Sequence, residues 1–221
     1  MATPTIADRL AVVHERIAAA CARSGRSPED VTLIAVTKGF GPDAIQQAVS
    51  AGVRDIGENR VQEAQAKRGD LTNLPLTWHM IGHLQTNKVR AALALFDIIH
   101  SVDSVHLAEA ISERALTLVP AFLEVNAGAE PQKSGFSLDE LPAAFEQIAQ
   151  LPNLEVRGLM TVAPIARLPE DVRPVFRSLA RAARTLGLRE LSMGMTDDFE
   201  VAIEEGATHV RIGRAIFGER V

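Results

Sequence analysis

The chain of 221 residues has a mass of 23.8 kDa; 47% of its residues are hydrophobic and 23% are charged, which excludes a disordered or fibrous protein. Its net charge of −5 excludes a general basic surface for nucleic acid, and no apolar run approaches the roughly 18 residues of a membrane helix. The single cysteine, Cys21, excludes an intrachain disulfide, and the segment MATPTIADRL lacks the basic and apolar parts of a secretory signal. We therefore expect a cytoplasmic protein.

The first predicted element is a helix over about residues 4–24. Thr3 offers a cap and Pro4 suits the first turn, while Gly25 is a typical helix end. Apolar residues recur on one face of this helix at Ile6, Leu10, Val13, Ile17 and Cys21.

Strand-like and helix-like segments alternate over the remainder of the chain. The eight strand-like runs are TLIAVTK, VRDIGEN, LTWHMIG, DIIHSVD, PAFLEVNAG, LEVRGLMTVA, LRELSMG and THVRIG. A helix-like segment follows each run except the last. This order is typical of parallel strands joined by right-handed crossovers.

Eight such repeats predict an α/β fold, a single (β/α)8 barrel of the TIM type over about residues 31–218 with an extra N-terminal helix. A doubly wound open sheet is the alternative. The chain stops eight residues after Gly213, too soon for a long eighth helix. We expect the helix over about residues 4–24 to fill that gap, and residues 1–221 to form one domain.

The carboxyl ends of barrel strands carry the chemistry of this fold class. Lys38 closes the most hydrophobic strand, and lysine is rare here, with four lysines against nineteen arginines. Burial at a strand end disfavours the ammonium form and frees the amine for a Schiff base. The alternative is a lysine that leaves the rim to reach solvent.

The turns after the seventh and eighth strands contain Gly194, Thr196 and Gly213. Glycine lets backbone amides approach an anion, and barrels commonly hold phosphate at these two loops. The alternative is that Thr196 or Asp197 caps the next helix, with Glu200 completing a capping box. A Schiff-base lysine and a phosphate cup on one rim describe a pyridoxal phosphate site.

Motifs along nearly the whole chain resemble those of one family. They are IAVTK, GENRVQEAQAK, WHMIGHLQTNK, HSVDS, KSGF, GLMTVAP and LSMGMTDDFEVAIEEGATHVRIGRAIFG. In this order they are similar to the pyridoxal phosphate homeostasis protein family. The resemblance implies a barrel like the amino-terminal domain of alanine racemase.

The resemblance also implies the cofactor contacts. It implies that Lys38 carries pyridoxal phosphate as a Schiff base. The segment VRIGRAIFG is similar to the segment by which alanine racemases hold the pyridine nitrogen and the phosphate. On that match Arg211 faces the ring nitrogen, and the backbone amides of Gly213 and Arg214 face the phosphate.

Five further residues are candidate neighbours of the cofactor. Ser192 or Thr196 adds a hydroxyl to the phosphate site. Asn59, at the end of the second strand, is a candidate neighbour of the ring or the phosphate. Met160 packs against the ring or belongs to the core, and Lys133 is a second amine on the rim or an ordinary loop lysine.

Two residues depart from the family pattern, which often has serine at position 196 and a small hydroxyl residue at position 214. Thr196 keeps the hydroxyl. Arg214 keeps the backbone donor and adds a charge, which leaves two arrangements open: the side chain clamps the phosphate or swings outward.

Several features argue against catalytic turnover. A guanidinium has no proton to pass to the ring nitrogen, so the cofactor is a poor electron sink. Racemisation needs a second base, which in alanine racemases is a tyrosine of a separate domain, and this chain has no tyrosine. His83 and His79 are the remaining candidates. Neither these histidines nor the nearby carboxylates show the spacing of a metal site.

We therefore predict a protein that stores, sequesters or delivers pyridoxal phosphate. The first alternative is a pyridoxal phosphate-dependent amino-acid racemase or lyase, and the second is a barrel enzyme acting on a sugar phosphate or flavin. The expected partners are pyridoxal phosphate, amino acids and apo pyridoxal phosphate-dependent enzymes, with no nucleic acid or membrane. We expect a monomer or weak dimer.

Overall fold

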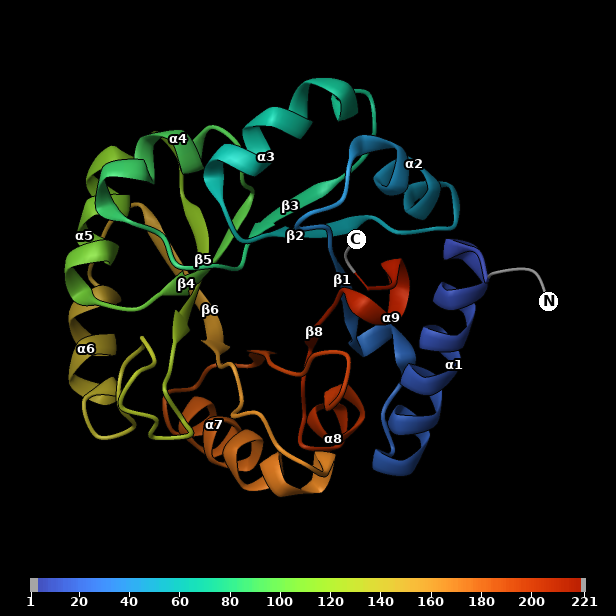
Figure 1. The fold of residues 1–221 in the computed structure, drawn as a ribbon. Coiled ribbons are helices and arrows are strands. Elements are labelled where there is room, and N and C mark those ends of the chain that lie inside the picture. Colours follow the sequence, from blue (N-terminus) through green and yellow to red (C-terminus); the bar gives the residue numbers. More distant parts are fainter. Residues whose placement is uncertain (1–3, 220–221) are drawn as a thin grey trace.

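Eight parallel strands close into a barrel in the order in which they occur along the chain (Figure 1). The computed structural model describes residues 4–219. The barrel closes where β1 pairs with β8, through the register of Ile34 with Arg211. The strands are β1 (Thr32–Val36), β2 (Asp55–Glu58), β3 (Thr77–Met80), β4 (Ile98–Val102), β5 (Val119–Glu124), β6 (Leu154–Met160), β7 (Glu190–Ser192) and β8 (His209–Ile212). The predicted (β/α)8 barrel is confirmed, and the open-sheet alternative is wrong.

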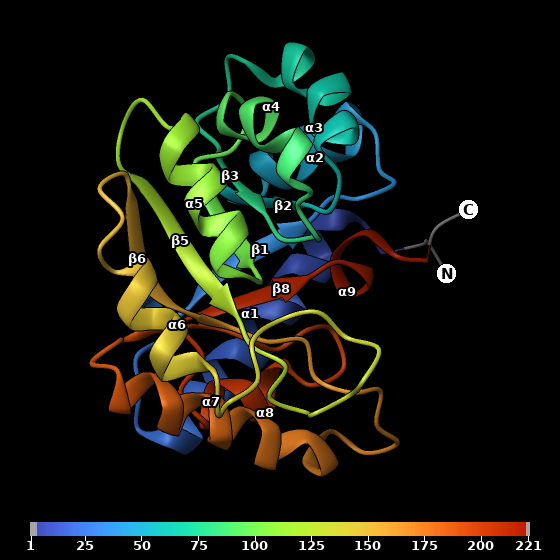
Figure 2. The same cartoon turned by 90° about the vertical axis from the view of Figure 1, so that its left-hand side faces the viewer.

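Helices surround the barrel, and most of them link consecutive strands (Figures 1 and 2). The α-helices are α1 (Ile6–Ser24), α2 (Pro42–Ser50), α3 (Val61–Arg68), α4 (Val89–Leu93), α5 (Val105–Arg114), α6 (Leu141–Ile148), α7 (Arg173–Thr185), α8 (Phe199–Glu204) and α9 (Arg214–Phe217). Short 3₁₀ turns are η1 (Pro28–Asp30), η2 (Gly69–Leu71), η3 (Thr86–Lys88) and η4 (Pro169–Val172). Across residues 4–219, none of the helices combines the length and apolar character needed to cross a membrane.

Helix α1 takes the place of a long eighth helix. It lies between α2 and α8 in Figure 1, and it packs against α2, α8 and α9. Its buried face contains four of the five predicted residues, and the fifth, Ile6, is half-buried. The predicted cap Thr3 lies outside the described residues. The helix instead begins after Thr5, whose side chain forms a capping box with Asp8.

The inside of the barrel contains a buried polar layer. His79 on β3, His100 on β4 and Ser192 on β7 are each at most 1% exposed. The Nδ1 atom of His100 lies 2.8 Å from the Ser192 Oγ. Because β4 and β7 are not neighbours in the barrel, this contact crosses its interior. The barrel therefore holds a hydrogen-bonded network among its strands.

Removing packing volume from α1 tests whether this helix completes the ring. Ile17 is 3% exposed, and we expect Ile17→Ala to lower the free energy of unfolding by about 2–5 kcal/mol, because the cavity left behind cannot fully collapse. Val12, on the same helix, is 54% exposed, so Val12→Ala should change it by less than about 0.5 kcal/mol. Urea denaturation measures both, and equal small losses would contradict a packed role for α1.

Candidate functional site

Lys38 follows β1 at the carboxyl end of the barrel, where its side chain is half-buried. A small cavity of about 160 Å³ lies beside it. Lys38 shares this cavity with the two residues predicted to face a phosphate, Gly213 and Arg214. The other lining residues are Val36, Phe40, Gly218 and Glu219. The cavity therefore joins the loop after β1 to the loop after β8.

A buried lysine of α3 holds the loop that carries Lys38. The Lys67 Nζ donates to the Thr37 carbonyl oxygen at 2.8 Å and to the Glu58 Oε1 at 2.7 Å. It also pairs with Glu63 at 2.8 Å, one helical turn earlier. Lys67 is only 7% exposed, so this ammonium is compensated by two carboxylates and a carbonyl oxygen rather than by water.

The two carboxylates in turn fix the residues on either side of Lys38. The Thr37 hydroxyl donates to Glu58 Oε1 at 2.5 Å, and the backbone N–H of Gly39 donates to Glu63 Oε1. The backbone just before and just after Lys38 is thereby tied to one ion cluster. We call Glu58, Glu63 and Lys67 the α3 ion cluster.

The carboxyl groups of the α3 ion cluster have different acidities. Burial raises the pKa of Glu58, and the hydrogen bonds from Lys67 and Thr37 oppose that shift. Burial also acts to raise the pKa of Glu63, but the hydrogen bonds from Gly39 and Lys67 outweigh it and hold that pKa below its usual range. Lys67 thus favours the ionised form of Glu58, against the effect of burial.

Arg211 lies inside the carboxyl end of the barrel and is 4% exposed. Its NH1 donates to the Ser192 carbonyl oxygen at 2.7 Å and to the Ser192 Oγ at 2.6 Å, and its NH2 donates to the Thr161 carbonyl oxygen at 2.8 Å. Burial lowers the pKa of Arg211 to about 10, and the charges of Glu124 and Asp198 favour its charged form. The three hydrogen bonds therefore fix the plane of the Arg211 guanidinium, which is positively charged at neutral pH.

The two candidate hydroxyls lie in different places. The Ser192 Oγ is fully buried and already bonded to Arg211 and His100 inside the barrel. The Thr196 Oγ1 instead accepts from the backbone N–H of Ala215 at 3.5 Å, so it joins the loop after β7 to α9. Of the two hydroxyls, that of Thr196 is the one that contacts the segment after β8.

The Arg214 side chain pairs outward with carboxylates. Its NH2 contacts both Oδ atoms of Asp197, the second at 2.6 Å, and its Nε lies 3.6 Å from Glu219. The hydrogen bond and charge of Asp197 raise the pKa of Arg214. The structure thus has the outward arrangement of the two that the sequence left open.

The predicted capping role of Thr196 or Asp197 is wrong. Helix α8 begins at Phe199, and Asp198 occupies the cap position. The predicted partner Glu200 instead pairs with Arg16 of α1 at 3.2 Å. Residues 193–198 form a loop, and Gly194 within it has φ +94° and no room for a Cβ, which would lie 2.6 Å from the Ala202 Cβ.

Asn59 lies at the end of β2, close under the loop after β3. A Cβ on Gly82 would come 2.4 Å from the Asn59 carbonyl oxygen, so only glycine permits this approach. Within residues 4–219, Asn59 Oδ1 and Glu58 Oε2 are buried without a hydrogen-bond partner. Buried acceptors of this kind are rare and call for a donor.

The remaining candidates are held elsewhere. Met160, the last residue of β6, is 1% exposed. Lys133 donates to the carbonyl oxygens of Val162 and Ala163, both at 3.1 Å, and pairs with Glu130. Lys133 therefore ties the loop after β5 to the loop after β6, which fits the loop-lysine interpretation.

The two candidate histidine bases differ in exposure. The His83 side chain is 58% exposed and its Nδ1 lies 3.0 Å from Asp103. His79 is buried and is bonded at both ring nitrogens, to His100 and Asp55. In the described part of the chain, no group of three His, Cys, Asp or Glu side chains could hold a metal ion.

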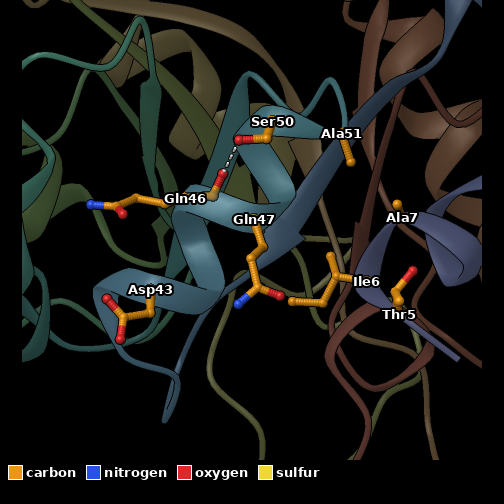
Figure 3. Close-up of a pocket in the computed structure, with 8 residues that line it drawn as sticks. All are labelled: Thr5, Ile6, Ala7, Asp43, Gln46, Gln47, Ser50 and Ala51. Atoms are coloured by element: carbon orange, nitrogen blue, oxygen red, sulfur yellow. Dashed lines mark hydrogen bonds between the residues drawn. The ribbon is translucent and has the colours of Figure 1, made fainter. Parts of the chain in front are cut away.

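A larger groove of about 750 Å³ lies outside the barrel between α1 and α2 (Figure 3). Ile6 and Gln47 approach each other across it. None of the strand-end residues lines this groove. The larger volume of this groove therefore does not identify it as the functional site. The smaller cavity beside Lys38 is the candidate site.

Sequence reasoning missed the α3 ion cluster and the histidine contacts inside the barrel. Two signals pointed to the cluster: Glu63 and Lys67 are four residues apart, and Lys67 is one of only four lysines. For His79 and His100 no local signal exists, because their partners are 21 to 92 residues distant in sequence.

Comparisons with known proteins support one family. A family model described as "Alanine racemase, N-terminal domain" matches residues 10–221. The chain is 45% identical over 222 residues to the pyridoxal phosphate homeostasis protein of Aquifex aeolicus, covering 96% of this chain and 97% of that protein. It is 44% identical over 227 residues to that of Pseudomonas aeruginosa, covering 98% and 96%.

Solved structures agree with this result. PipY of Synechococcus elongatus with pyridoxal phosphate bound has a TM-score of 0.83 and 39% identity, over 97% of this chain and 100% of that one. Alanine racemase from Corynebacterium glutamicum has a TM-score of 0.72 and 20% identity, over 95% of this chain and 61% of that one. The racemase likeness is one of fold alone.

Removing the ammonium of the α3 ion cluster tests its role. We expect Lys67→Met to lower the free energy of unfolding by about 3–5 kcal/mol, because it leaves buried Glu58 without its cation. Lys88→Met, the same change outside the cluster, should cost less than about 1 kcal/mol. Chemical denaturation measures the free energy of unfolding of both variants.

The loss in Lys67→Met should depend on pH. Without Lys67 the folded-state pKa of Glu58 rises further above its unfolded value, so the folded protein binds more protons between the two values. Stability then falls as pH rises through that window, and the loss should be larger at pH 8 than at pH 5. A loss independent of pH would contradict this assignment.

Proposed function

Because the chain belongs to the pyridoxal phosphate homeostasis protein family, we propose that it binds pyridoxal phosphate as a Schiff base on Lys38 and serves its storage, sequestration or delivery in the cytoplasm. The observation that carries this proposal is the shared cavity. Lys38 supplies an amine, and Gly213 and Arg214 supply backbone donors, at one small site. The PipY relative has pyridoxal phosphate bound.

Residues at the carboxyl end of the barrel, some of them outside the cavity beside Lys38, offer partners for the chemical groups of pyridoxal phosphate. When bound, the cofactor supplies an aldehyde that reacts with amines, a phosphate and a ring nitrogen. Arg211 retains two guanidinium hydrogens beyond its three bonds to Ser192 and Thr161, and these are donors for the ring nitrogen. The unsatisfied Asn59 Oδ1, directly after β2, is an acceptor for a ring substituent.

The phosphate end is built from the loops after β7 and β8. Thr196 offers a hydroxyl, and the backbone of Gly213 and Arg214 offers N–H donors. The Arg214 side chain is engaged by Asp197 and Glu219, so we assign the contact to its backbone N–H rather than to its guanidinium. Met160, which is buried at the end of β6, is assigned to the core rather than to the cofactor ring.

Binding and release without turnover is the activity that these residues support best. Arg211 is pinned as a donor and has no proton to transfer to the ring. His79 has both nitrogens engaged inside the barrel, so it cannot act as a second base at the rim. Amino acids or apo pyridoxal phosphate-dependent enzymes are the proposed recipients, and a monomer or weak dimer is the proposed assembly.

The alternative is a pyridoxal phosphate-dependent racemase or lyase. One observation favours it: His83 lies at the rim beside Asp103, the arrangement of a general base oriented by a carboxylate. Steady-state turnover of a D- or L-amino acid, lost in both Lys38→Ala and His83→Ala, would support this alternative over the storage proposal.

Borohydride reduction tests the proposed Schiff base. After incubation with pyridoxal phosphate and reduction, we expect mass spectrometry to find the pyridoxyl group on the peptide that contains Lys38. Lys38→Ala should lose the adduct, because no amine then faces the cavity. Lys133→Ala, the matched change of a rim lysine bonded to carbonyl oxygens, should keep it. An unmodified Lys38 in the wild-type protein would refute the proposal.

A further inference from the structure

An unbroken line of hydrogen bonds connects the two ends of the barrel. Asp55, the first residue of β2, lies 3.0 Å from the Nε2 of His79. The Nδ1 of His79 lies 2.8 Å from the Nε2 of His100, and the Nδ1 of His100 lies 2.8 Å from the Ser192 Oγ. That hydroxyl accepts from Arg211 at 2.6 Å. We call Asp55, His79, His100 and Ser192 the relay.

With His79 in its neutral form, the acceptor at Asp55 gives every bond of the relay the same direction. An ionised carboxylate only accepts, so Asp55 requires the hydrogen of His79 to be on Nε2. The Nδ1 of a neutral His79 then accepts, which puts the hydrogen of His100 on Nε2 as well. The Nδ1 of His100 is left to accept the Ser192 hydroxyl hydrogen. Arg211 only donates, which agrees with this direction.

The surroundings of His100 keep it neutral. Its ring is fully buried and stacks on Phe122, with ring centroids 4.3 Å apart. Burial lowers the pKa of His100 well below its usual value, and the charge of Arg211 acts in the same direction. Burial likewise lowers the pKa of His209 to about 4. A neutral His100 carries one hydrogen, which preserves the direction of the relay.

The relay constrains how Arg211 can turn. Both hydrogens on its NH1 are used by Ser192, one on the carbonyl oxygen and one on the Oγ. If the Ser192 hydroxyl had no acceptor at His100, its hydrogen would compete for the position that the Arg211 donor occupies. The relay removes this competition, so the two remaining donors of Arg211 keep a fixed direction.

We propose that the relay positions the Arg211 guanidinium for the ring nitrogen of pyridoxal phosphate, with Asp55 at the opposite end of the barrel as a positioning residue. This inference rests on the proposed function for its ligand. It assigns to Asp55, His79 and His100 a role at the cofactor that they exert only through Ser192 and Arg211.

The tautomers of the two histidines provide the first test. In a two-bond ¹H–¹⁵N spectrum of the uncomplexed protein at pH 7, we expect His79 and His100 both to carry hydrogen on Nε2 and not on Nδ1. A ring of either residue with hydrogen on Nδ1, or an imidazolium, would overturn the proposal. This measurement needs neither cofactor nor variant.

Substitutions at Asp55 provide the second test. Asp55→Leu removes the acceptor, and we expect mixed tautomers at His100 and about tenfold weaker binding of pyridoxal phosphate. Asp55→Asn keeps an oxygen acceptor and should stay within about twofold of wild type. Glu155→Gln, which changes an exposed carboxylate near the start of β6 that pairs with Arg157 outside the relay, should leave both readouts unchanged.

These outcomes separate the two proposals. If Asp55→Leu folds but keeps wild-type tautomers and wild-type affinity, the relay is refuted while Lys38 loading stands. If wild-type Lys38 is never loaded, the proposed function fails, whereas the tautomers still decide whether the relay exists. Asp55→Asn binding as weakly as Asp55→Leu would also refute the relay, because an acceptor would then be insufficient.

Discussion

The candidate site depends most on the hydrogen bonds and ion pairs of the Lys67 ammonium. Lys67 is almost completely shielded from solvent, and its Nζ donates hydrogen bonds to two carboxylates and to the carbonyl oxygen of Thr37. Burying the charges of Lys67 and Glu58 costs solvation free energy, which the fold recovers only if their geometry is kept. That geometry sets the path of the backbone on both sides of Lys38. The position of the Lys38 backbone is thus determined from α3, an element that does not itself line the cavity.

A second buried polar system supports the other side of the site. The relay crosses the barrel and ends on Arg211, while the α3 ion cluster lies under the loop after β1. One system orients an amine and the other a guanidinium, and each is anchored by a carboxylate. A barrel filled only with Val, Ile and Leu would be simpler to pack, but it could not fix the direction of a donor. The two polar systems therefore fix the directions of side chains at the rim.

Much of this architecture was predictable from local patterns. The alternation of short apolar strands with helices predicts the barrel, and the structure confirms it, including the use of α1 in place of a long last helix. Strand ends also predict that Lys38, Gly213 and Arg214 lie near each other, since parallel strands bring their carboxyl ends to one rim. The partners of Ser192 were not predictable, because a side chain inside a barrel meets strands that are remote in sequence. The direction of Arg214 depends on Asp197, a neighbour that only the folded loops provide.

The cavity beside Lys38 has a consequence for the order of events during protein synthesis. One wall comes from β1, near the start of the chain, and the opposite wall comes from residues 213–219. During synthesis, Lys38 therefore leaves the ribosome long before residues 213–219, which face it across the cavity. Until residues 213–219 emerge, a nascent chain has Lys38 but not the residues that face it across the cavity. The cavity, and any binding that needs both of its walls, can therefore form only after residues 213–219 have left the ribosome.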